Sequence, residues 1–128
     1  TFLSAESNVN IVTGPNSGGK STYLLQVALM TILAHLGCYV PAAYASFRLT
    51  DQIFAIMVQE EDIESNTSTF VSEMRQLAYV LQNSNDKSLI LIDELGRATS
   101  TLQGISICWA TCEELLQKKA YTLFVTHF

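Results

Sequence analysis

The stretch Gly14-Pro-Asn-Ser-Gly-Gly-Lys-Ser21 lies between a short β-branched run, Val9 to Thr13, and a periodic apolar segment that begins at Lys20. It fits the pattern G-x-x-x-x-G-K-[ST], whose glycines let successive backbone N–H groups surround phosphate oxygens. Lys20 would bring a positive charge to the β- and γ-phosphates, and Ser21 would offer its hydroxyl to Mg²⁺. The following helix would point its N-terminus at the same anion. The stretch therefore predicts a nucleotide-phosphate site, with a glycine-rich turn that binds nothing as the alternative.

A second motif follows the apolar run Leu89 to Ile92, which is typical of a strand covered on both faces. Asp93 would then lie at the edge of the sheet, where it could hold Mg²⁺ through water. Glu94 is expected to leave the strand on the opposite face and to orient or deprotonate the attacking water. An Asp-Glu pair could also be a solvated turn, but its presence beside a phosphate loop favours the catalytic interpretation.

Strand and helix patterns alternate along the chain, which predicts an α/β domain with a mostly parallel sheet. The expected strands are Val9–Thr13, Ile53–Val58, Leu89–Ile92 and Tyr121–Thr126, of which the first, third and fourth are expected to be buried. The expected helices are Lys20–Leu36, a second that starts near Ser68 or Thr69, and a third after the Asp-Glu pair. Gln59–Asn66, between the second strand and second helix, is expected to be a solvated loop.

Each expected helix has an apolar face that would pack on the sheet. On the first it comprises Leu24, Leu25, Ala28, Leu29, Ile32, Leu33 and Leu36. On the second it comprises Phe70, Met74, Leu77, Ala78 and Leu81. On the third it comprises Ile105, Cys108, Trp109, Cys112, Leu115 and Leu116.

Polar residues follow three of the strands, as Thr13-Gly14, Asp93-Glu94 and Thr126-His127. Because ligands of parallel sheets bind beyond the carboxyl ends of the strands, these residues are expected to converge on one site. His127 would sense the γ-phosphate there; an ordinary surface or core histidine is the alternative. Ser68 or Thr69 would cap the second helix, and that helix terminus could also face a nucleotide bound by a second subunit.

Composition and length exclude several other classes of protein for this segment. The 128 residues suit one domain, and seven Lys and Arg against twelve Asp and Glu give a net charge of −5, which argues against a nucleic-acid-binding surface in this segment alone. No apolar run approaches the length of a membrane span. The three cysteines have no metal-binding spacing and are expected to be small buried residues in a reducing compartment. Lacking an initiator Met and a leader, the sequence is expected to be part of a longer protein.

Five segments resemble MutS proteins and occur in the order seen in that family. They are Thr13-Gly-Pro-Asn-Ser-Gly-Gly-Lys-Ser-Thr22, Gly37-Cys-Tyr-Val-Pro-Ala42, Ser68-Thr-Phe-Val-Ser-Glu-Met74, Asp93-Glu-Leu-Gly-Arg-Ala-Thr-Ser-Thr101 and Thr126-His-Phe128. The resemblance extends over nearly the whole chain. Two further segments, 62–70 and 85–94, are most similar to the eukaryotic meiotic branch of the family.

The resemblance implies that residues 1–128 are one ATPase domain, truncated at both ends, with a three-layer P-loop NTPase fold like that of ABC-type ATPases. It implies ATP and Mg²⁺ as ligands, a second MutS-family subunit as partner, and DNA bound through domains outside this segment. The nucleotide loop would comprise Gly14, Pro15, Asn16, Ser17, Gly18, Gly19, Lys20, Ser21 and Thr22. Ser21 and Asp93 would serve Mg²⁺, Glu94 the hydrolytic water, His127 the γ-phosphate, and Ser68 the nucleotide of the partner.

For the meiotic branch the resemblance further implies a nuclear protein that stabilises recombination intermediates and promotes crossovers, whereas mismatch repair is the alternative within the family. One departure bears on catalysis. Ala98 stands where the family usually has glycine, and a positive φ at that position would cost about 1 kcal/mol.

Three functional hypotheses follow. The first is an ATP-driven switch that hydrolyses slowly, with most of its activity in the assembled dimer because half of each site comes from another subunit. The second is a module in which ATP joins two subunits without efficient hydrolysis, which an impaired loop at Ala98 would favour. The third is an ABC-type or chromosome-structure ATPase outside the family; the chain has Thr67-Ser-Thr-Phe70 in place of the Ser-Gly-Gly signature of those proteins, which disfavours it.

Overall fold

The computed structural model describes residues 1–15, 18–57 and 69–128. Within these ranges it contains, in chain order, β1 (Val9–Val12), α1 (Lys20–His35), β2 (Gln52–Ile56), α2 (Thr69–Asn83), β3 (Ser88–Asp93), α3 (Thr101–Lys118) and β4 (Tyr121–Val125). The predicted alternation of strands and helices is confirmed, with boundaries that differ by one or two residues. The loop predicted at Gln59–Asn66 lies outside the described residues.

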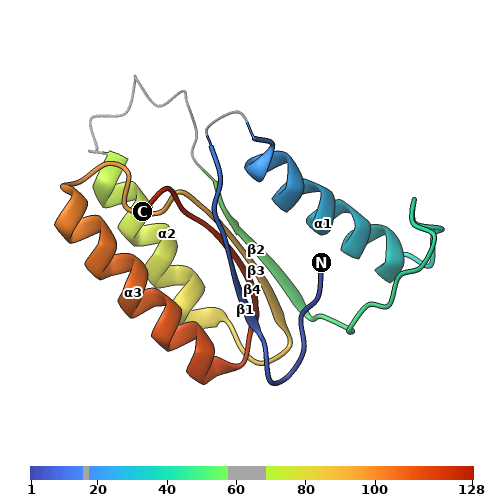
Figure 1. Ribbon diagram of the computed structural model, residues 1–128. Helices are drawn as coiled ribbons and strands as arrows, with labels where there is room; N and C mark the ends of the chain where they lie inside the picture. The colour runs from blue at the N-terminus through green and yellow to red at the C-terminus, as the bar shows by residue number, and fades with distance from the viewer. Residues whose placement is uncertain (16–17, 58–68) are drawn as a thin grey trace.

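The described strands form one parallel sheet in the order β1-β4-β3-β2. Helix α1 covers one face of this sheet, and α2 and α3 lie together on the other (Figure 1). Side chains of β3 alternate between the two layers: Leu89 and Leu91 pack on the α1 side, whereas Ile90 and Ile92 pack with α2 and α3. This period of two places a core on each face, and the predicted α/β class with a parallel sheet is confirmed.

Burial corrects three of the expectations. Strands β3 and β4 are buried as predicted, but β1 lies at an edge of the described sheet and its Ile11 is 61% exposed. On α1 the buried residues are Leu24 and Thr31, while four residues of the predicted face are exposed: Leu25, Leu29, Ile32 and Leu36. On α3 the buried residues are Gly104, Cys108, Thr111 and Leu115, and three predicted core residues are exposed: Ile105, Trp109 and Leu116.

The same physical reason explains the errors on both helices. Each helix is apolar over much of its circumference, so hydropathy alone does not say which stripe meets the sheet. On α2 the prediction is closer, since Leu77 is buried and Phe70, Met74 and Leu81 are partly buried, but Val80 completes the core in place of Ala78, which is exposed. Among the described residues, none of the helices is both long and apolar enough to cross a membrane.

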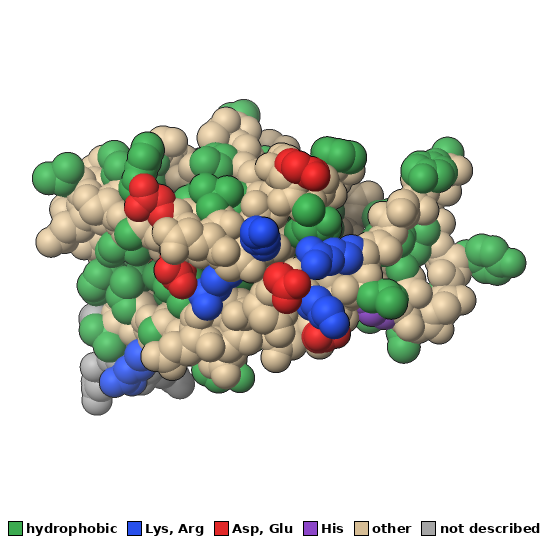
Figure 2. Space-filling view, turned by 90° about the horizontal axis from the view of Figure 1, so that it is seen from below, with side chains coloured by type: hydrophobic (Ala, Val, Ile, Leu, Met, Phe, Trp, Pro, Cys, Tyr) green, Lys and Arg blue, Asp and Glu red, His purple; other side chains and the backbone are tan. Residues whose placement is uncertain are grey.

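The two ends of the sheet carry different kinds of residues. At the amino ends of the strands, acidic and basic side chains are interspersed over the surface (Figure 2), and ion pairs such as Arg48–Asp86 join some of them. The carboxyl ends, at the top of Figure 1, carry the phosphate-loop sequence and the Asp-Glu pair.

Candidate functional site

The carboxyl ends of β1, β3 and β4 lie side by side, as the sequence predicts. Val125 of β4 pairs with Val12 of β1 on one side and with Asp93 of β3 on the other. Two further backbone hydrogen bonds continue the pairing past the strand ends, from the Thr126 N–H to Val12 O at 3.2 Å and from the Glu94 N–H to Val125 O at 3.0 Å. The residues that follow the three strands are therefore delivered to one edge of the sheet.

The loop after β1 is shaped by glycines. The Gly18 N–H donates to Pro15 O at 3.1 Å, and a Cβ at Gly18 would lie 2.9 Å from that same oxygen, so a larger residue would break the turn. Gly19, with φ 78°, precedes the first residue of α1. Asn16 and Ser17 lie outside the described residues. Ser21 and Thr22 are exposed in the first turn of α1, where backbone N–H groups have no partner within the helix.

Lys20 connects this loop to the end of β3. Its Nζ donates to Gly14 O at 2.8 Å and to Pro15 O at 3.1 Å, and it lies 3.8 Å from Glu94 Oε1. The Lys20 side chain is only 8% exposed. Arg97 approaches the other carboxylate oxygen, with Nη1 3.2 Å from Glu94 Oε2. Glu94 is thus held between two cations beside the loop that follows β1.

The direction of Glu94 does not come from strand alternation, which corrects the sequence argument. Strand β3 ends at Asp93, and Glu94 has φ 52°, one of two positive φ values among the described non-glycine residues. The pleat therefore stops before Glu94, and its left-handed backbone sets the direction of the carboxylate.

Asp93 is suited to a cation at this edge. It is 6% exposed, and its Oδ1 is buried without a hydrogen-bond partner among the described residues. A buried carboxylate oxygen is costly unless it is paired or bound to a cation. No group of three His, Cys, Asp or Glu side chains that could hold a metal occurs in the described part of the chain. A Mg²⁺ ion here would consequently take its other ligands from a hydroxyl such as that of Ser21, from water and from phosphate oxygens.

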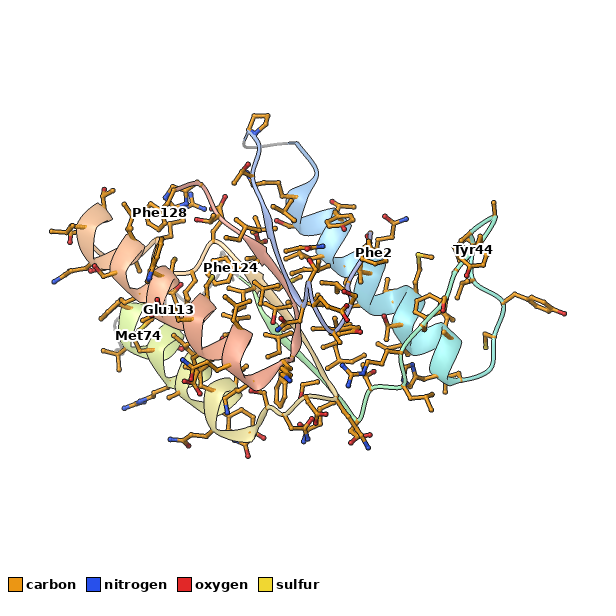
Figure 3. The ribbon with its side chains drawn as sticks, turned by 60° about the horizontal axis from the view of Figure 1, so that its bottom comes forward. Phe2, Tyr44, Met74, Glu113, Phe124 and Phe128 are labelled. Atoms are coloured by element: carbon orange, nitrogen blue, oxygen red, sulfur yellow. The ribbon has the colours of Figure 1, made fainter. Side chains whose placement is uncertain are left out.

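His127 follows β4 at the same end of the sheet and is exposed, and its ring lies against that of Phe128, tilted by 37° at a centroid distance of 4.2 Å. Phe128, labelled in Figure 3, lies beside α3, and its N–H donates to Thr126 Oγ1 at 3.1 Å. The role of His127 at a phosphate stays a prediction. Ser68 lies outside the described residues, and α2 begins directly after it at Thr69.

The loop after Glu94 is fixed by contacts that the sequence does not predict. The Gly96 N–H donates to Glu73 Oε1 of α2 at 2.8 Å, and the Cys108 thiol donates to Leu95 O at 3.2 Å. Burial, with smaller contributions from Cys112 and Glu73, raises the pKa of Cys108 to about 11. Glu73 and Arg97 lie in two of the segments that resemble MutS proteins, but their roles depend on contacts across the fold that no local pattern reveals.

The same loop contains Ala98, for which a strained backbone was considered from the sequence. The positive φ values of the described non-glycine residues are at Glu94 and Lys119, not at Ala98. Alanine is therefore unstrained at position 98, and the cost considered for it does not arise.

Comparison with known proteins identifies the family to which the chain is similar. Residues 10–128 match the family described as MutS domain V. The chain is 59% identical over 128 residues to "MutS protein homolog 4" of Homo sapiens and 60% identical to the Mus musculus protein of that name. It is 53% identical over 126 residues to "DNA mismatch repair protein MSH4" of Arabidopsis thaliana. All or nearly all of the chain is covered (100%, 100% and 98%), but it spans only 14%, 13% and 16% of these three relatives.

Proposed function

The chain belongs to the MutS family, of which it represents domain V, and on this premise we propose that it is the ATP-binding and ATP-hydrolysing part of a MutS-type DNA clamp. The observation that carries the proposal is the convergence of the phosphate loop and Glu94, with Lys20 Nζ 3.8 Å from Glu94 Oε1 at the carboxyl edge of the sheet. The fold is then that of a P-loop NTPase, similar to ABC-type ATPases.

Binding is the task of the loop Gly14 to Thr22. Backbone N–H groups of the loop and of the first turn of α1 donate to phosphate oxygens, and the helix dipole favours the same negative charge. Lys20 is held beside the loop by Gly14 O and Pro15 O. These bonds support a role for its ammonium group in pairing with the β- and γ-phosphates, because a side chain already confined beside the loop would lose little freedom on binding.

Hydrolysis is the task of Glu94 and the residues around it. Its carboxylate accepts a proton from the attacking water or orients that water, while Lys20 and Arg97 hold it in place. His127 donates a hydrogen bond to the γ-phosphoryl group from the end of β4. When bound, Mg²⁺ neutralises charge on the phosphate oxygens, and Asp93 and Ser21 are the residues that would hold it.

The wider role rests on the family. A second MutS-family subunit would complete the site, with Ser68 of this chain reaching the nucleotide of the partner, and DNA would be held by other parts of the protein. The similarity to proteins named MutS homologue four favours the meiotic branch, with action on recombination intermediates in the nucleus, over mismatch repair.

The test uses the full-length protein with its MutS-family partner. Filter binding of Mg-ATP and single-turnover hydrolysis should both be measurable, and Glu94→Gln should bind Mg-ATP but hydrolyse it far more slowly. A protein that binds Mg-ATP tightly yet does not hydrolyse it would favour the nucleotide-dependent dimerisation module. A protein that fails to bind Mg-ATP at all would refute the proposed function.

A further inference from the structure

Glu94 has a strained backbone that must be held by its surroundings. At φ 52° a residue with a Cβ is in the left-handed region, which is unfavourable for every residue except glycine. Such strain persists only where neighbouring contacts over-determine the conformation, and it is concentrated at functional sites. If the backbone of Glu94 relaxed to a right-handed or extended conformation, its carboxylate would turn away from Lys20 and Arg97.

Three contacts flank the strained residue. The Glu94 N–H is bonded to Val125 O, and the carbonyl of the fully buried Leu95 accepts from the Cys108 thiol, which is a weak donor. The third contact is the 2.8 Å hydrogen bond from the Gly96 N–H to Glu73 Oε1. It joins the loop to α2, and its acceptor is a charged side chain, which makes it stronger than the bond from the Cys108 thiol.

Glu73 has a partly buried carboxylate, with only one of its two oxygens hydrogen-bonded among the described residues. It lies in the second turn of α2, beside Met74, which packs in the core shared with α3 (Figure 3). Its second oxygen, Oε2, is buried without a hydrogen-bond partner among the described residues. Burying a carboxylate oxygen without a hydrogen-bond partner costs folding free energy that an apolar side chain at this position would not cost. The bond to Gly96 is therefore the feature that accounts for a charged residue at this position.

We propose that Glu73 is a positioning residue for hydrolysis: by accepting the Gly96 N–H it holds the loop that keeps Glu94 in its left-handed conformation and its carboxylate beside Lys20. This inference rests on the proposed function. It assigns to α2 an effect on the hydrolytic group that acts through the loop after β3, because the hydrogen bond of Glu73 among the described residues is to Gly96 of that loop.

The experiment compares three variants of the full-length protein with its partner. Glu73→Ala removes the acceptor, Glu73→Gln retains an accepting oxygen in the same position, and Glu114→Ala removes an exposed carboxylate of α3 as a matched control. We expect Glu73→Ala to slow single-turnover hydrolysis about tenfold, equivalent to about 1.4 kcal/mol, with the Kd for Mg-ATP unchanged. Glu73→Gln should restore most of the rate, and Glu114→Ala should match the wild type.

A second readout does not depend on hydrolysis. Hydrogen exchange at the Gly96 amide, followed by mass spectrometry of peptides from 94–100, should be faster in Glu73→Ala than in the wild type and in Glu73→Gln. The inference is overturned if Glu73→Ala hydrolyses at the wild-type rate, if it loses binding in proportion to rate, or if glutamine is as slow as alanine. If the wild type itself shows no hydrolysis, the proposed function fails, and the exchange measurement still decides whether Glu73 holds the loop.

Discussion

Replacing Gly96 by alanine should destabilise this domain by about 2–4 kcal/mol, the sum of a conformational and a steric cost. Gly96 has φ 80°, where alanine costs about 1 kcal/mol. In addition, a Cβ at this position would lie 2.8 Å from the Cα of Gly104 and 3.3 Å from its carbonyl oxygen. Because both are backbone atoms of α3, no rotamer change relieves the contact, and the backbone shift that it forces costs a further ~1–3 kcal/mol.

Gly37→Ala is the matched control for this prediction. Gly37 has a nearly identical φ of 75°, but among the described residues no heavy atom lies within 4 Å of the place that a Cβ would occupy. It should therefore lose only the conformational contribution of about 1 kcal/mol. The free energy of unfolding of the domain can be measured within the full-length protein by urea titration with pulsed hydrogen exchange. Equal losses for the two variants would refute the steric argument for Gly96.

Three further predictions concern the site and its thiols. Lys20→Ala should weaken Mg-ATP binding about ten- to hundredfold in calorimetric titrations, whereas Lys118→Ala, at a surface ion pair, should not; equal effects would argue against a specific phosphate contact. Glu94→Gln should bind Mg-ATP normally and slow single-turnover hydrolysis by about a hundredfold or more; a wild-type rate would exclude Glu94 as the base. Because burial raises the pKa of Cys108 from 9.0 to about 11, its alkylation at pH 8 should be far slower than that of the exposed Cys38. The unfolded thiol ionises first as pH rises, so stability should fall between about pH 9 and 11; a Cys108 that reacts as fast as Cys38 would contradict its burial.

The sequence was sufficient to predict the helices and strands, and to predict that the candidate site residues follow the carboxyl ends of neighbouring strands. Strand β3 is buried at all six positions, so its continuous apolar run could be recognised without other information. The end of the first helix near Leu36 was also predicted, and Gly37, which follows it, has the left-handed φ of 75° that is common after a helix end. Cys108 is buried as expected, but Cys38 is exposed, because it lies beyond that helix end.

What the sequence did not reveal depends on contacts between distant segments. Hydropathy could not separate the buried Leu24 of α1 from the exposed Leu25 and Leu29, since only the position of the sheet distinguishes them. The bond between Glu73 and Gly96 spans 23 residues and exists because α2 and α3 share one face of the sheet. The left-handed backbone of Glu94 is likewise imposed by its neighbours and opposes the residue's own preference.

The proposed function requires that a nucleoside triphosphate binds at the carboxyl ends of the strands, beside Lys20. Affinity labelling of Lys20 tests this requirement most directly. An acyl-phosphate derivative of ATP transfers its acyl group to a lysine that lies beside the phosphates, and mass spectrometry then identifies the modified residue. In the full-length protein with its partner, Lys20 should be acylated, and excess Mg-ATP should suppress that modification. Labelling confined to other lysines, with Lys20 unmodified and indifferent to Mg-ATP, would contradict the account.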